Sequence, residues 1–174
     1  EVEAVGASGA GDVEFAVVSM SERSADGADA AYLEWHVLDH LPEQFRLLGL
    51  RWGQRWVSSP GCRAARAASE PPFDAVDHVV AYLFAPAPRG GVDAALDAFF
   101  GLGAALHHAG RMPLALPARR VAVYEVLGAT AARRVLVGAA VLPWRPLRGV
   151  YLLVERCEPG SGPVASPHEL LDVE

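Results

Sequence analysis

The chain has 174 residues, of which 52% are hydrophobic and 21% charged, and its formal net charge is −6. This length fits one domain with an appendage, and the apolar content excludes an intrinsically disordered chain. All 15 basic residues are arginines without a basic run, which argues against nucleic-acid binding. No stretch reaches the roughly 18 apolar residues of a membrane span. Two cysteines cannot form a disulfide framework, which favours a reducing, cytoplasmic location.

The first half of the chain predicts a strand, a broken helix and a second strand. Residues 13–20 form a short, β-branched apolar run typical of a buried strand. Asp29 is the expected N-cap of a helix that runs to residue 41, and Pro42 should break it and begin a second helical piece. Residues 51–58 place aromatic side chains at strand spacing, so we expect the second strand there.

The second half of the domain repeats this pattern. Residues 59–77 form a long polar connection, a kind of loop that is often functional or mobile. We expect a strand over 78–84, a helix over 92–111 and a strand over 119–127. The order β-α-β-β-α-β predicts a ferredoxin-like α+β domain, with an antiparallel sheet covered by helices on one face.

The strand expected over 78–84 is apolar on both faces, so the sheet face without helices should also be buried. A second copy of the chain is the simplest cover, which predicts a homodimer.

Three further segments complete the expected organisation. Residues 1–12 are small and polar and should form a disordered leader ahead of a domain over 13–130. Residues 131–157 contain two β-like runs, 133–142 and 149–156, and predict a β extension or arm that can be exchanged between the subunits of a dimer. Residues 158–174 should form a tail.

The segment Tyr32–Ser58 (YLEWHVLDHLPEQFRLLGLRWGQRWVS) resembles the first helix and second strand of EthD-like proteins, in the dimeric α+β barrel superfamily. The matching features are an aromatic-rich helix, the His40-Leu41-Pro42 element, a Leu-Gly turn and an aromatic strand. The resemblance implies homodimers with face-to-face sheets and a small-molecule pocket between helices and sheet. Its known activities are cofactor-free oxygenation, lactone isomerisation, polyketide cyclisation and haem degradation, and many members have none known. The 131–174 extension departs from the minimal family pattern.

His40 and Glu34 are the first candidate catalytic residues. His40 precedes Pro42, and an imidazole both accepts and donates a proton near neutral pH. By the resemblance, His40 is also the position that contacts ligand or transfers protons. The alternative is that His40 only hydrogen-bonds the local chain break. Glu34 falls in the apolar arc of a helical wheel, where desolvation would raise its pKa. The alternatives are a pair with Arg51 or Arg55, or a rotated helix that leaves Glu34 at its edge.

His36 is a further catalytic candidate, because its spacing from His40 places both on one helix face. The same spacing suits two metal ligands, and Asp39, Glu43 or His78 could supply a third. Two ligands alone do not define a site, so we expect no metal and no cofactor.

Trp52, Gln54 and Trp56 share one face of the second expected strand, and with Tyr82 they are candidate walls of a site for a planar ligand. The alternative is that the aromatic residues belong to the ordinary core. Gly53 between them indicates a bulge or a close approach of the backbone.

The sequence therefore favours a small-molecule-binding dimeric α+β barrel. Its activity would be that of a cofactor-independent enzyme of the monooxygenase, isomerase or cyclase type, acting on a small aromatic or polyketide-like compound. The alternative is a non-catalytic, stress-associated or ligand-binding dimer. In either case the expected partners are a second copy and a small molecule, with neither nucleic acid nor membrane.

Overall fold

A computed structural model describes residues 13–67, 69–85, 90–114, 118–129, 131, 138, 141, 144 and 147–155. Val13–Glu125 is one compact unit, and the remainder of the chain belongs to a second. All the helices and strands described below belong to Val13–Glu125.

The centre of this unit is a four-stranded antiparallel sheet with the order β2-β3-β1-β4. Its strands are β1 (Phe15–Ser21), β2 (Leu50–Val57), β3 (His78–Phe84) and β4 (Ala118–Glu125). The chain is helical at α1 (Asp29–Trp35), η1 (His36–His40), α2 (Leu41–Gln44), α3 (Pro60–Ala64), η2 (Phe73–Ala75) and α4 (Gly91–His108). The expected α+β class and antiparallel sheet are confirmed, and the strand order is compatible with a ferredoxin-like fold.

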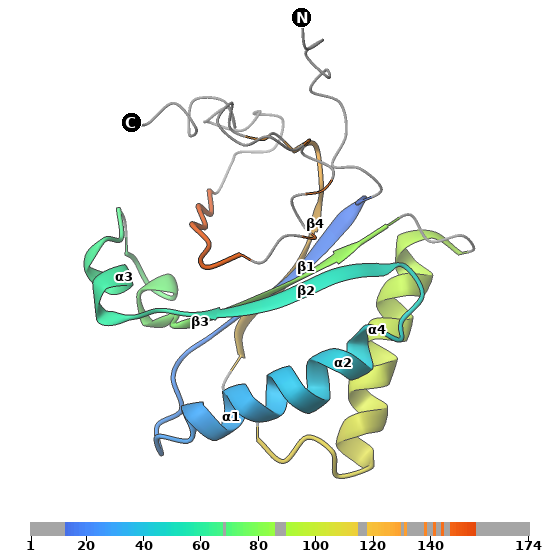
Figure 1. Cartoon of the computed structure of the whole chain (residues 1–174), viewed down its shortest axis with the longest axis horizontal. Coiled ribbons are helices and arrows are strands. Elements are labelled where there is room, and N and C mark those ends of the chain that lie inside the picture. Colours follow the sequence, from blue (N-terminus) through green and yellow to red (C-terminus); the bar gives the residue numbers. More distant parts are fainter. Residues whose placement is uncertain are drawn as a thin grey trace, which may run out of the picture. The chain divides into compact units, whose positions relative to one another are not determined.

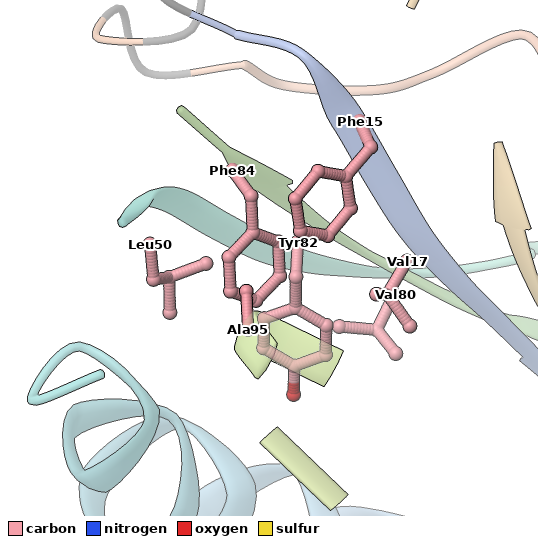
Figure 2. Close-up of a cluster of buried hydrophobic side chains, with 7 residues drawn as sticks. All are labelled: Phe15, Val17, Leu50, Val80, Tyr82, Phe84 and Ala95. Atoms are coloured by element: carbon pink, nitrogen blue, oxygen red, sulfur yellow. The ribbon is translucent and has the colours of Figure 1, made fainter. Parts of the chain in front are cut away.

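The main apolar cluster lies on the helix-facing side of the sheet, and Ala16, Val18 and Met20, which point to the opposite face, are buried as well at 8%, 8% and 2% exposed. Helices α1, α2 and α4 lie on the same side of the sheet (Figure 1). Along β3 the side chains that face these helices are fully buried and the intervening ones half-buried, because neighbouring strand residues point to opposite faces. Figure 2 shows the buried apolar cluster on the helix-facing side: Phe15, Val17, Leu50, Val80, Tyr82, Phe84 and Ala95.

The helical segment before β2 differs from the expectation at two points. Ala28 is the N-cap of α1, and Asp29 is its first helical residue. Pro42 does not break the helix, because η1 is a π-helix in which the Leu41 N–H donates to the carbonyl of His36. Proline has no N–H and crowds the carbonyl four residues earlier in an α-helix. A turn widened by one residue relieves this crowding, so helical structure continues into α2.

The connection between β2 and β3 is held by ion pairs. Arg63 of α3 donates two hydrogen bonds to the Asp77 carboxylate, and the Asp77 side chain is only 2% exposed. Arg23 lies 3.3 Å from the same carboxylate. Arg66 donates to the carbonyls of Asp74 and Val76. These contacts tie the connection to the start of β3.

The expected leader 1–12 and tail 158–174 lie outside the described residues, as does most of the expected arm 131–157. Within that arm, residues 149–155 are described and have no strand, although the sequence predicts one there. Val150 to Val154 are 40–67% exposed. A β-strand needs a partner for its backbone hydrogen bonds, and no described residue pairs with this segment.

Candidate functional site

A group of polar side chains lies between the helical segment 29–44 and the helix-facing side of the sheet. The helical segment contributes residues at four-residue spacing, which places them on one face. β2 and β3 contribute one side chain each. We call this group the polar cluster; its members are Tyr32, His36, His40, Gln44, Arg55 and Tyr82.

Gly53 brings the helical segment close to the sheet. A Cβ atom at this position would lie 2.9 Å from Cδ1 of Tyr82 and 3.0 Å from Cδ1 of Leu41. Real Cβ contacts are longer, so any side chain would push Tyr82 or Leu41 away. The expected close approach at Gly53 is confirmed, and it allows the helical segment to pack closely against the strands at the polar cluster.

Tyr82 and His36 form the buried centre of the polar cluster. The Tyr82 hydroxyl lies 3.3 Å from Nε2 of His36, and the residues are 3% and 1% exposed. Figure 2 shows the Tyr82 hydroxyl at the edge of the apolar cluster, pointing away from its carbon side chains. The ring thus belongs to the core, while its hydroxyl meets the helical segment.

Arg55 and Tyr32 form a second contact between β2 and α1. Nη2 of Arg55 donates to the Tyr32 hydroxyl at 3.0 Å, and Cζ of Arg55 lies 4.9 Å from the centre of the Tyr32 ring. Nε and Nη1 of Arg55 are buried and have no hydrogen-bond partner among the residues that the structure describes. Within the described residues, no carboxylate forms an ion pair with Arg55.

His40 lies at the half-buried edge of the polar cluster. Its Nε2 is 3.4 Å from Nε2 of Gln44, and its ring stacks on Trp35 at a centroid distance of 5.1 Å. The ring centres of His40 and His36 are 5.3 Å apart. His40 is therefore next to the buried centre of the cluster while keeping part of its surface exposed.

Burial keeps the imidazoles of the cluster neutral. It lowers the pKa of His36 from 6.5 to about 3, and the positive charge of Arg55 acts in the same direction. Burial and then Arg55 also lower the pKa of His40, while Asp39 opposes them. Burial raises the pKa of both Tyr82 and Tyr32. Near neutral pH the cluster therefore holds neutral histidines and protonated tyrosines around the Arg55 cation.

A third histidine, His78, lies beside the cluster and is 0% exposed. Its Nε2 lies 2.9 Å from Oδ1 of Asp29. Burial lowers the pKa of His78 despite Asp29, so this contact is that of a neutral imidazole N–H donating to a carboxylate. In the part of the chain that the structure describes, no three metal-ligating side chains gather as a metal site.

The structure brings some of the candidate site residues together and separates others. It brings His36, His40 and Tyr82 together, whereas Glu34 is exposed. Glu34 therefore does not point into the core, and of the alternatives that the sequence leaves open the rotated helix is the one that the structure shows. The helix is rotated from the predicted wheel, so that Tyr32 and His36 face the sheet while Val37 and Leu38 are 51% and 71% exposed.

Trp52, Gln54 and Trp56 lie on the other side of the sheet from the polar cluster. Gly53 and Arg55 face the helices, and alternation along β2 turns their neighbours to the opposite face. The two indole rings pair there at 5.6 Å. The three side chains therefore do not share a site with His36, His40 and Tyr82.

Sequence reasoning missed Tyr32, Gln44 and Arg55 as members of the cluster. A signal for two of them was present, because Tyr32, His36, His40 and Gln44 recur every four residues. For Arg55 the signal was its alternation with Gly53, which shows the strand face that meets the helix.

No helix in the described part of the chain is long and apolar enough to cross a membrane. Comparison of the chain with models of protein families, with curated proteins and with solved structures finds no match.

Proposed function

We propose that this chain binds a small organic molecule at the polar cluster and moves a proton on it without a cofactor. The main support is a set of buried hydrogen-bonding atoms without a partner: Nδ1 of His36, Nδ1 of His40, Oε1 of Gln44, and Nε and Nη1 of Arg55. Buried polar atoms in structural networks are nearly always paired. Their concentration in one cluster supports a role in binding.

His40 is the proton-transferring residue in this proposal. Its imidazole is neutral near pH 7 and half-buried, so it can accept a proton from a bound molecule. Loss of a proton beside a carbonyl group places negative charge on the oxygen, which the Arg55 cation would stabilise. Return of the proton to another atom completes an isomerisation. In a cyclisation the enolate carbon would first attack a second carbonyl carbon of the same molecule, whose C=O π bond breaks, and the proton would return to the alkoxide oxygen. In a monooxygenase-type reaction on a CH2 group, molecular oxygen would instead add to the carbanion, and the resulting hydroperoxide would lose water to leave a carbonyl group, so that the carbon is oxidised and one oxygen atom leaves as water.

The proposal extends to a homodimer of the α+β barrel type. The resemblance of Tyr32–Ser58 to EthD-like proteins supports both the dimer and the class of small aromatic or polyketide-like ligands. The sheet face opposite α1, α2 and α4 carries Val79, Ala81 and Leu83 of β3, which is an apolar surface suited to a second sheet.

The alternative is a non-catalytic ligand-binding dimer. The observation in its favour is the near-complete burial of His36 and Tyr82, which resembles that of core residues. In this case His36 and Tyr82 position the helical segment, and binding occurs without proton transfer.

Deuterium exchange into 2-tetralone separates the two functions, because this small aromatic ketone has acidic α-protons. We expect the wild-type protein to bind 2-tetralone and accelerate its exchange in D2O, as followed by NMR. His40→Ala should lower the acceleration by about 10²–10⁴-fold, the usual contribution of a general base. His108→Ala, which changes an exposed histidine of α4, should leave it unchanged. Binding without exchange would support the non-catalytic alternative, and absence of binding would contradict both.

A further inference from the structure

Arg55 differs from the other arginines whose ion pairs the structure describes. Arg63 and Arg23 share the Asp77 carboxylate, and Arg111 binds Asp39 at 3.0 Å and Glu43 at 2.6 Å. Among the described residues, Arg55 has only the Tyr32 hydroxyl as a hydrogen-bond acceptor. Donors on two of its three guanidinium nitrogens are buried without an acceptor.

In the part of the chain that the structure describes, the groups around Arg55 do not compensate its positive charge. Tyr32 and Tyr82 are the groups whose charge would favour the Arg55 cation, and burial keeps both protonated. The histidines near it, His36 and His40, add no negative charge. Among the neighbouring carboxylates, Asp29 accepts from His78, and Asp39 pairs with Arg111 at the exposed surface.

Arg55 is half-buried, and guanidinium donors that are buried without a counter-charge cost stability unless a ligand pairs with them. From this placement we infer that the ligand of the polar cluster is a small organic oxyanion, a carboxylate or an enolate, whose negative oxygen accepts from Arg55. This inference rests on the proposed binding function and names the chemical class of its ligand. Carboxylates and enolates share the oxygen acceptor that the free guanidinium donors require.

The surroundings of Arg55 favour an organic anion over an inorganic one. Aromatic rings line the polar cluster: Tyr32 stacks on His36 at 5.9 Å, and Trp35 stacks on His40 at 5.1 Å. Flat apolar surface next to a cation suits an aromatic or conjugated oxyanion, whereas a small hydrated anion gains nothing from it.

Benzoate and benzamide form a matched pair of probes, because they share the ring and differ in charge. We expect NMR titration to show benzoate binding to the wild-type protein at least about 10-fold more tightly than benzamide, a difference of about 1.4 kcal/mol. Inorganic phosphate, titrated in parallel, should bind more weakly than benzoate. Shifts should centre on the His36 and His40 ring signals, and benzoate alone should raise the pKa of these imidazoles.

Substitution of Arg55 tests whether this residue binds the negatively charged oxygen of the ligand. Arg55→Gln should abolish the preference for benzoate, and Arg55→Lys should retain part of it because the positive charge remains. Arg51→Gln, the same change at an exposed position of β2, should leave the preference intact. Arg55→Met should unfold at a higher temperature than wild type, because the uncompensated buried charge is removed.

The outcomes separate the inference from the proposed function. Equal binding of benzoate and benzamide, a preference that survives Arg55→Gln, or phosphate binding as tight as that of benzoate would overturn the oxyanion inference. Each of these leaves ligand binding at the polar cluster in place. If neither benzoate nor benzamide binds while 2-tetralone does, the oxyanion inference fails alone. If no aromatic probe shifts the histidine signals, both fail.

Discussion

His36 is a buried imidazole whose pKa is lowered to about 3 by burial, so it is neutral in the folded chain near neutral pH. Its side chain is 1% exposed, and its ring lies against Tyr32, Tyr82 and His40. A charged imidazole at this position would lose its hydration without gaining a carboxylate. His36 therefore acts as a fixed hydrogen-bonding group, whereas the half-buried His40 is placed to exchange protons with a ligand.

The lowered pKa of His36 predicts a loss of stability in acid. Above pH 6.5 His36 is neutral in both the folded and the unfolded chain, so stability does not depend on its titration. Below pH 6.5 the unfolded chain binds a proton that the folded chain refuses down to about pH 3. The free energy of unfolding should therefore fall by about 1.4 kcal/mol per pH unit for this one residue. Urea unfolding of wild type and His36→Gln between pH 7 and pH 5 measures this pH dependence. If the free energy of unfolding falls equally with pH in both proteins, the lowered pKa of His36 is contradicted.

Gly53 gives a second prediction for a single residue. Gly53→Ala should lower the free energy of unfolding by about 1–3 kcal/mol, because the new methyl group meets Tyr82 and Leu41 in a packed site. Gly101→Ala in α4, where a Cβ meets nothing within 4 Å, should instead raise it by about 0.5–1 kcal/mol. Chemical denaturation of the two variants measures both values. An unchanged free energy of unfolding in Gly53→Ala would show that Tyr82 and Leu41 can move to make room for the methyl group at little cost.

Among the elements, the helical segment 29–44 shows how polar contacts override a hydrophobic pattern. A helical wheel turns Val37 and Leu38 inward, but the structure exposes both and buries Tyr32, His36 and Gln44. Each inward ring gains a contact with the sheet or a neighbouring ring. The π-helical turn of η1 keeps this face aligned across Pro42.

The α3 connection offers a prediction about local stability. The Arg63 contact and the neighbouring arginines lower the pKa of Asp77. Asp77→Asn should destabilise the fold by about 1–3 kcal/mol, a moderate value because Arg23 and Arg63 are about half exposed. Limited trypsin digestion should then cleave after Arg63 and Arg66 faster than in wild type. Asp74→Asn, the same change at an exposed side chain, is the control; equal cleavage in both variants would mean that Asp77 does not hold the connection.

For the whole molecule, the proposed dimer depends on the sheet face opposite the helices. Ala16 and Val18 of β1 lie on this face next to Leu83 and Ala81 of β3. Ala16 and Val18 are already only 8% exposed in the single chain, so a second sheet would bury mainly the half-buried Val79, Ala81 and Leu83 of β3.

Light scattering after size exclusion tests this dimer. Wild type should elute with the mass of two chains, and Ala81→Glu should elute as a monomer, because an uncompensated buried charge costs about 3–5 kcal/mol. Ala104→Glu on the exposed side of α4 should leave the dimer intact. A monomeric wild-type protein would remove the dimer from the proposed function while leaving the polar cluster unaffected.

The sequence by itself determined the strands, α4 and the antiparallel α+β class, because alternation and helical periodicity depend on residues close together in the chain. It also marked His36, His40, Tyr82 and the close approach at Gly53. Only the tertiary structure decided which face of the helical segment meets the sheet. That choice depends on contacts such as Arg55 with Tyr32 and Tyr82 with His36, which join residues 23 and 46 positions apart. A helical wheel considers the residues of one helix alone, so it placed Glu34 on the buried side and gave no indication that Arg55 of β2 contacts the helix.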